Sequence, residues 1–195
     1  STINYIHVLF EWEEISDISN YNLLVTSDNS TILDITTPNL YHVDEQNINW
    51  DTSYSWQVCN SDNPSQCSDI YNFHTGSEID LGELNLTVYD SSQYYDGVTM
   101  FGNLTPAFSA AIDENGRQIW NSGGLNTFCY FKHDYSEKYI FYAGKYNDDP
   151  INILPGIEFD IDGNPSGCLV LGLWKPDCFR VRQGSGVASR RLVPI

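Results

Sequence analysis

A short motif occurs twice in this chain, 47 residues apart, and it constrains the fold more than any other sequence feature. The first copy is Asp113-Glu114-Asn115-Gly116 and the second is Asp160-Ile161-Asp162-Gly163, each flanked by strand-like residues. Asn-Gly and Asp-Gly predict tight hairpins, because a type I′ turn needs a positive φ at both central residues. A hairpin that returns after about 40–50 residues has the spacing of β-propeller blades. The chain after the second copy is too short to complete such a propeller.

The first 77 residues have a different pattern, in which short strands alternate with polar turns. We expect strands at 6–12, 21–26, 31–35, 41–43, 54–59 and 70–75, with turn clusters such as Ser27-Asp28-Asn29-Ser30 between them. This spacing is typical of an antiparallel β-sandwich. In the fifth strand Tyr54, Trp56 and Val58 should face inward, because burying large apolar side chains is stabilising. Ser55, Gln57 and Cys59 share the opposite face.

This first region resembles a fibronectin type III domain. The resemblance is carried, in order, by Phe10-Glu11-Trp12, Tyr21-Asn22-Leu23-Leu24-Val25, Tyr54-Ser55-Trp56-Gln57-Val58 and Tyr71-Asn72-Phe73-His74-Thr75-Gly76. It covers residues 1–77 and implies an immunoglobulin-like sandwich.

Residues 78–164 show no helical period and predict further strands at 84–88, 98–101, 108–112, 118–120, 128–131, 139–142 and 157–159. They resemble the opening of an arylsulfotransferase-type β-propeller, whose members often carry a small sandwich before the propeller. The matching runs are Asp96-Gly97-Val98-Thr99-Met100-Phe101, residues 112–120, Phe131-Lys132-His133-Asp134, residues 139–144 and residues 157–164. The resemblance implies that this region supplies the first one to two blades.

That family transfers sulfuryl groups from aryl sulfates to phenols through a covalent His intermediate, assisted by further His and Arg residues. Those residues come from later blades, so no catalytic residue is carried over to this chain. His133, between Lys132 and Asp134, is predicted to be a loop residue. The resemblance implies an aryl sulfate sulfotransferase as the parent protein and a chain that is catalytically incomplete by itself, so whether it is an enzyme stays open.

Residues 165–195 differ from both neighbours. They contain 5 basic residues and 1 acidic residue, whereas the chain up to Asn164 contains 25 acidic and 4 basic residues. Pro165-Ser166-Gly167 should also break the strand that returns from the second hairpin. We expect a poorly ordered tail that arises from a frameshift, a misjoined gene or a truncation; a natural basic tail is the alternative.

The charge and hydropathy of the chain limit the classes of molecule that it is expected to bind. The net charge is −17, and no Lys or Arg occurs before Arg117. Such a surface repels nucleic acid and anionic lipid, and no run is long enough for a membrane helix, so we expect neither nucleic-acid binding nor membrane insertion. The chain opens on Ser1 without a signal-peptide pattern, so we expect a secreted protein, extracellular or periplasmic, whose signal peptide has been removed.

The chain contains five cysteines, an odd number, and three glycosylation sequons. Cys59 and Cys67 flank a polar loop and are candidates for a disulfide across a hairpin, with two unpaired thiols as the alternative. Cys129, Cys168 and Cys178 form neither a C-x-x-C pair nor a zinc pattern. The sequons begin at Asn29, Asn85 and Asn103.

Other polar patterns in the sequence favour structural roles over functional sites. The run 160–164 resembles the start of a calcium loop but lacks the later Gly and Glu of an EF-hand. Glu13-Glu14 and Asp148-Asp149 are neighbours, so neither pair can face across a sugar. Gly184-Ser185-Gly186 lacks the strand and helix of a phosphate loop. We predict no catalytic residue, no cofactor and no metal site.

The competing function is an extracellular binding, adhesion or filament-forming sandwich protein without enzymatic activity. Exposed strand edges would allow self-association. Tyr94-Tyr95 and Tyr139-Ile140-Phe141-Tyr142 could offer a platform for a carbohydrate or phenolic ligand, although a sheet core explains the same residues.

Overall fold

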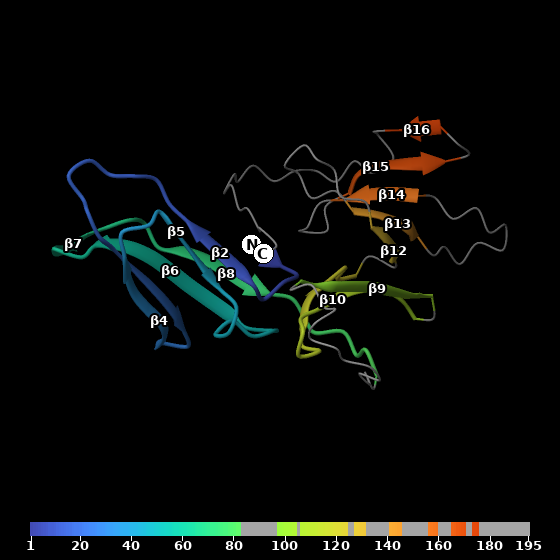
Figure 1. Cartoon of the computed structure of the whole chain (residues 1–195), viewed down its shortest axis with the longest axis horizontal. Coiled ribbons are helices and arrows are strands. Elements are labelled where there is room, and N and C mark those ends of the chain that lie inside the picture. The colour runs from blue at the N-terminus through green and yellow to red at the C-terminus, as the bar shows by residue number, and fades with distance from the viewer. Residues whose placement is uncertain are drawn as a thin grey trace, which may run out of the picture. The chain divides into compact units, whose positions relative to one another are not determined.

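The computed structural model describes residues 1–82, 97–104, 106–124, 127–131, 141–145, 156–159, 165–170 and 173–175. Every regular element within these residues is a β-strand, so the protein is all-β, as its sequence predicts. The described strands fall into two compact units, the first holding residues 1–77 and the second beginning at Glu78 (Figure 1).

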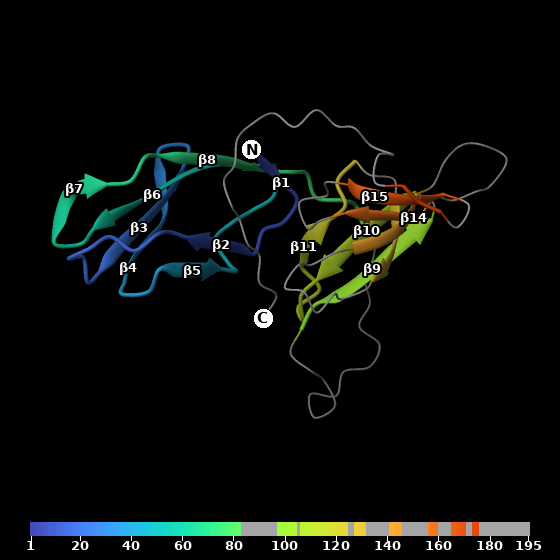
Figure 2. The same cartoon turned by 90° about the horizontal axis from the view of Figure 1, so that it is seen from above.

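The first unit contains eight strands: β1 (Thr2–Ile3), β2 (Val8–Glu11), β3 (Tyr21–Ser27), β4 (Ser30–Thr37), β5 (Tyr41–Asp44), β6 (Ser53–Asn60), β7 (Asn63–Cys67) and β8 (Tyr71–Thr75). One sheet has the order β1-β8-β6-β3-β4, and β7 also pairs with β6. β2 and β5 pair with each other and form the second layer (Figure 2). Among the strand pairs within residues 1–77, only β1–β8 is parallel, and these strands form a β-sandwich.

Aromatic side chains fill the space between the two layers. Phe10 of β2 lies edge-on to Trp56 of β6, with ring centroids 5.4 Å apart, and its centroid is 6.2 Å from that of Phe73 in β8. Tyr54 and Val58 of β6 are also buried. The inward set expected from alternation in this strand is therefore confirmed, and it joins the two layers through one apolar core.

The turn between β3 and β4 is a two-residue hairpin. Its two central residues, Asp28 and Asn29, have φ values of 48° and 62°. Positive φ at both positions is the signature of a type I′ turn, whose twist matches that of the flanking strands. Asp and Asn tolerate this region better than other side chains do, so the turn forms without a glycine.

The described strands of the second unit form two antiparallel sheets. β9 (Thr99–Leu104), β10 (Ala107–Ile112) and β11 (Gln118–Asn121) lie in the order β11-β10-β9. The other sheet is a meander of β12 (Thr127–Phe131), β13 (Phe141–Lys145), β14 (Gly156–Phe159), β15 (Pro165–Val170) and β16 (Leu173–Lys175). Among the described strands, β12 is the one through which the second sheet lies against β9 and β10.

The start of the second unit is held by a buried amide. The Gln118 side chain, 2% exposed, donates from Nε2 to the Ile79 carbonyl at 2.8 Å and accepts the Ile79 N–H at 3.1 Å. Its Oε1 also accepts a hydrogen bond from Asn121 Nδ2 at 2.8 Å. Buried polar groups are stable when satisfied in this way, so Gln118 is a structural residue of β11.

The first copy of the repeated motif forms a hairpin turn, but not the type I′ turn that its Asn-Gly pair predicts. Gly116 has a φ of 78°, whereas Asn115 is not in the positive-φ region. The Gly116 N–H donates to the Asp113 carbonyl at 3.1 Å, and the Asp113 carboxylate accepts the N–H groups of Asn115 and Arg117, both at 2.9 Å. The loop is therefore longer, because the Asp113 side chain organises it as an Asx turn.

The strand pattern does not stop at Pro165, so the expected break at that residue is wrong. β15 begins at Pro165, which lies opposite Phe159 of β14, and β16 continues the sheet to Lys175. Proline is tolerated at the first residue of a strand, and the register shift between Glu158 and Phe159 accommodates it there. The expected strand 84–88, the second motif copy at 160–163 and the chain after Lys175 lie outside the described residues.

Candidate functional site

A polar depression of about 660 Å³ opens on the outer face of the six-stranded sheet. It is lined by Ser1, Thr2, Thr26, Ser27, Asp28, Asn29, Ser53, Tyr54, Ser55, Asn72, Phe73 and His74. These residues come from β1, β6, β8 and the β3–β4 hairpin. The depression therefore depends on the fold of the first unit alone.

Hydroxyl and amide groups dominate the lining. The Ser55 hydroxyl donates to Asn72 Oδ1 at 2.7 Å, which fixes the amide orientation across β6 and β8. The Thr26 hydroxyl lies 3.4 Å from the Ser55 carbonyl oxygen. Tyr54 and Phe73 point into the core, where they are 3% and 4% exposed, so they contribute backbone rather than aromatic faces to the depression.

Ser53, His74 and Asp51 lie together at the edge of the depression in an arrangement like that of a hydrolase triad. Ser53 Oγ is 3.1 Å from His74 Nδ1, but His74 Nε2 is 3.7 Å from Asp51 Oδ1, beyond hydrogen-bonding distance. The His74 and Asp51 side chains are 42% and 77% exposed, whereas a triad carboxylate is buried and holds its His. The group is therefore a solvated polar cluster and not a catalytic triad.

Local sequence patterns could not have indicated this cluster. Ser53 and His74 lie directly opposite each other in the β6–β8 ladder, as do Ser55 and Asn72. The two residues of each pair are separated in sequence by the β6–β7 hairpin. Only the pairing of β6 with β8 brings them together.

The other candidate residues are not gathered into a site. His42 lies in β5, opposite Phe10, and His7 precedes β2, while His133 lies outside the described residues. No group of three or more His, Cys, Asp or Glu side chains in the described part of the chain could hold a metal ion. Glu13 and Glu14 are exposed in the β2–β3 connection; Asp148, Asp149, Tyr94 and Tyr95 also lie outside the described residues.

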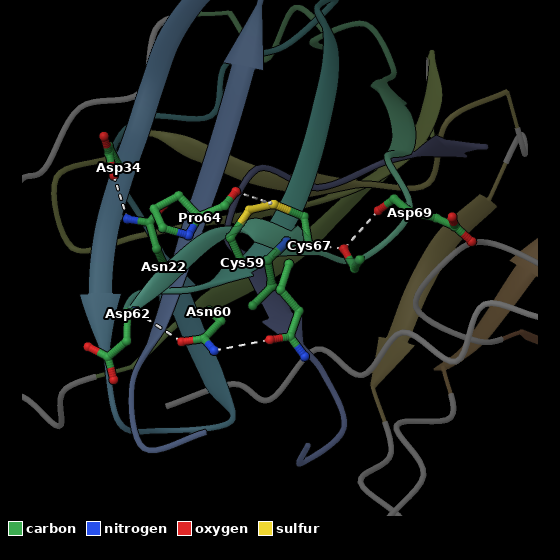
Figure 3. Close-up of a disulfide and its surroundings, with 11 residues drawn as sticks. Asn22, Asp34, Cys59, Asn60, Asp62, Pro64, Cys67 and Asp69 are labelled. Carbon is green, nitrogen blue, oxygen red and sulfur yellow. Dashed lines mark hydrogen bonds between the residues drawn. A yellow bond between two sulfur atoms is a disulfide. The ribbon is translucent and has the colours of Figure 1, made fainter. Parts of the chain in front are cut away.

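Cys59 and Cys67 form the disulfide that their spacing predicts (Figure 3). They lie opposite each other in β6 and β7, with Cα atoms 4.0 Å apart. Asn60 and Gln66 extend the same hairpin through a 3.2 Å side-chain hydrogen bond. Cys59 is buried and Cys67 exposed, so the bond fastens the exposed strand β7 to β6, an interior strand of the sheet.

The remaining cysteines belong to the second unit or lie outside the described residues. Cys129 lies in β12, opposite Ala143, and Cys168 lies in β15, opposite Ile157. Two strands separate β12 from β15 in the sheet order, and Cys178 is outside the described part.

The three sequons fall in different surroundings. Asn29 is exposed at the tip of the type I′ turn and lines the depression. Asn103 lies within β9, opposite Phe108 of β10. Asn85 lies outside the described residues.

Comparison of the chain with protein-family models, curated proteins and solved structures finds no match. Within the described residues, no helix is long and apolar enough to span a membrane. The geometry of the depression is thus the basis on which a function can be argued.

Proposed function

We propose that the first unit is a fibronectin type III-like, extracellular binding module that holds a neutral, hydroxyl-rich ligand, such as a carbohydrate, in the polar depression. The single observation that carries the proposal is the lining, in which eight of twelve residues offer a short hydroxyl or a side-chain amide. These groups both donate and accept hydrogen bonds, which matches the hydroxyl groups of a sugar.

The charge of the unit supports a neutral ligand over an anionic one. No Lys or Arg occurs before Arg117, so residues 1–77 have no guanidinium or side-chain ammonium group with which to bind phosphate, sulfate or carboxylate. The volume of about 660 Å³ lies within the range of small-molecule sites. A disulfide in so small a unit is compatible with an oxidising, extracellular location.

Isothermal titration with neutral oligosaccharides, chosen from an array screen, tests the proposal. Asn72→Ala should weaken binding about 2- to 12-fold, the effect of losing a hydrogen bond of about 0.5–1.5 kcal/mol. Asn22→Ala is the matched control, because the Asn22 amide donates to Asp34 at 2.7 Å (Figure 3). Neither Asn22 nor Asp34 lines the depression. Absence of any neutral ligand, or equal weakening by both variants, would overturn the proposal.

We also propose that the second unit is the opening of an arylsulfotransferase-like propeller in a longer parent protein. The consecutive antiparallel order of β12 to β16 favours it, because propeller blades are antiparallel meanders. The meander has one strand more than the four of a blade, and β16 is its shortest strand.

The coding DNA downstream of the Lys175 codon, translated in three frames, tests this second proposal. A frame with further Asp-x-Asp/Asn-Gly hairpins at the same period would support it, and the corresponding longer chain should then transfer sulfate from an aryl sulfate to a phenol. If no frame continues the hairpins, the enzyme proposal fails while the binding proposal is unaffected.

A further inference from the structure

We infer that Asn29 is an acceptor for N-linked carbohydrate, and that it is used in preference to Asn103. The sequon is Asn29-Ser30-Thr31, and the side chains of all three residues are exposed. Its position at the centre of a two-residue turn places Asn29 at the tip of the β3–β4 hairpin.

The Asn29 side-chain amide is free to accept a sugar. Within residues 1–82, no hydrogen bond or ring contact engages it, whereas Asn22 and Asn72 use their amides in cross-strand hydrogen bonds of 2.7 Å. A glycan on Nδ2 therefore displaces no hydrogen bond of the folded unit. It would occupy the Asn29 amide at the rim of the depression and leave the other seven hydroxyl and amide residues of the lining unmodified. Surface loops are also where glycosylated sequons are found in secreted proteins.

Asn103 is also exposed, but it does not lie in a turn. It lies inside β9, where it is paired with Phe108 of the adjacent strand, and it already has an interaction partner. A bulky glycan at this position would be crowded by the adjacent paired strand, whereas a glycan on a turn extends into solvent. The two sequons of the described residues are thus distinguishable by their local structure.

The modification joins the amide to a sugar supplied by a polyprenyl diphosphate-linked oligosaccharide. The C1–O bond to the diphosphate breaks and a bond from Asn29 Nδ2 to C1 forms. The amide loses one proton to solvent, and the polyprenyl diphosphate leaves. Thr31 is needed because the transferring enzyme recognises the Asn-x-Ser/Thr sequence.

Secretion of the full chain from a eukaryotic host tests the inference. Because no Lys or Arg precedes Arg117, the protein is cleaved at acidic residues rather than with trypsin. An amidase that removes N-glycans converts each occupied Asn to Asp, a mass increase of about 1 Da that mass spectrometry assigns to its peptide. We expect this conversion at Asn29 and not at Asn103.

Two substitutions of Thr31 provide the matched pair. Thr31→Ala should abolish the conversion at Asn29 and Thr31→Ser should retain it, while both leave the turn residue Asn29 in place. Asn29→Gln is less informative, because it would also strain the positive-φ position. Secreted and cell-retained fractions are both analysed, so poor secretion cannot hide the result. An unmodified Asn29 in the wild-type chain, or conversion at Asn103 alone, would overturn the inference.

Discussion

Leu23 and Leu24 are neighbours in β3 that point to opposite faces of the sheet. Leu23 is 0% exposed and lies between Val58 and Ile35, whereas Leu24 is half-buried and lies between Gln57 and Asp34. Leu23→Ala should lower the free energy of unfolding by about 2–5 kcal/mol, because it leaves a cavity in the core. Leu24→Ala should lower the free energy of unfolding by clearly less, because Leu24 is only half-buried. Urea denaturation measures both, and equal losses would contradict the assignment of the faces.

The Thr75 hydroxyl makes a second residue-scale prediction. Thr75 is 0% exposed; its hydroxyl donates to the Asn49 carbonyl at 2.7 Å and accepts the Thr52 N–H at 3.0 Å. Thr75→Val keeps the shape but leaves these backbone groups without their partner, so we expect a loss of about 1–3 kcal/mol. Thr36→Val, on the exposed side of β4, is the control and should have little effect in the same denaturation measurement.

At the scale of elements, the β10–β11 loop depends on one glycine. A Cβ on Gly116 would meet nothing within 4 Å, so its φ of 78° is the only obstacle to a side chain. Gly116→Ala should therefore destabilise the second unit by about 1–2 kcal/mol. Gly124→Ala has equal space without a positive φ and should be neutral or slightly stabilising. The thermal midpoints of the two variants distinguish these outcomes. Equal changes in the midpoint would show that the positive φ of Gly116 is not the cause.

The disulfided hairpin β6–β7 supports a fourth prediction. Cross-linking a loop of this size should stabilise the first unit by about 2–3 kcal/mol in the chain-entropy model. In urea unfolding, the free energy of unfolding of the double variant Cys59→Ser/Cys67→Ser should be lower than that of the wild-type chain by this amount. A reductant should lower the free energy of unfolding of the wild-type chain to the value of the double variant. The reductant should leave the double variant unchanged; a further loss there would point to another disulfide.

Much of the strand pattern could be predicted from the sequence, because apolar alternation and turn residues are local signals. β3 and β6 were expected within two residues of their ends. β7 was missed, since Asn63-Pro64-Ser65-Gln66-Cys67 has the composition of a turn and becomes a strand through its pairing with β6. The turn at Gly116 was assigned the wrong type because the Asp113 side chain, not the Asn-Gly pair alone, decides it.

The depression could not be predicted in the same way. Its opposed pairs, Ser53 with His74 and Ser55 with Asn72, depend on the register between β6 and β8. Register is set by the whole core, so residues with no motif between them become neighbours only in the folded sheet.

At the scale of the whole molecule, acidic self-repulsion should limit stability. The net charge is −17, and the first 116 residues contain no Lys or Arg to offset it. Raising NaCl from low to moderate concentration should raise the thermal midpoint, since salt screens repulsion between exposed charges. A calorimetric series at fixed pH measures this, with an equal osmolality of glycerol as the uncharged control. A midpoint independent of salt would contradict the prediction.

The main sheet of the first unit ends in unequal edges. β4 offers eight residues and, among the described strands, contacts only β3. The opposite side is divided between β1, with two residues, the part of β8 that β1 leaves unpaired, and β7, with five residues that include Pro64 and the cross-linked Cys67. Growth of a fibre by strand addition needs a receptive edge on both sides of each copy. This sheet presents a long edge on one side only, so pairing through β4 would consume it and end the assembly at two copies.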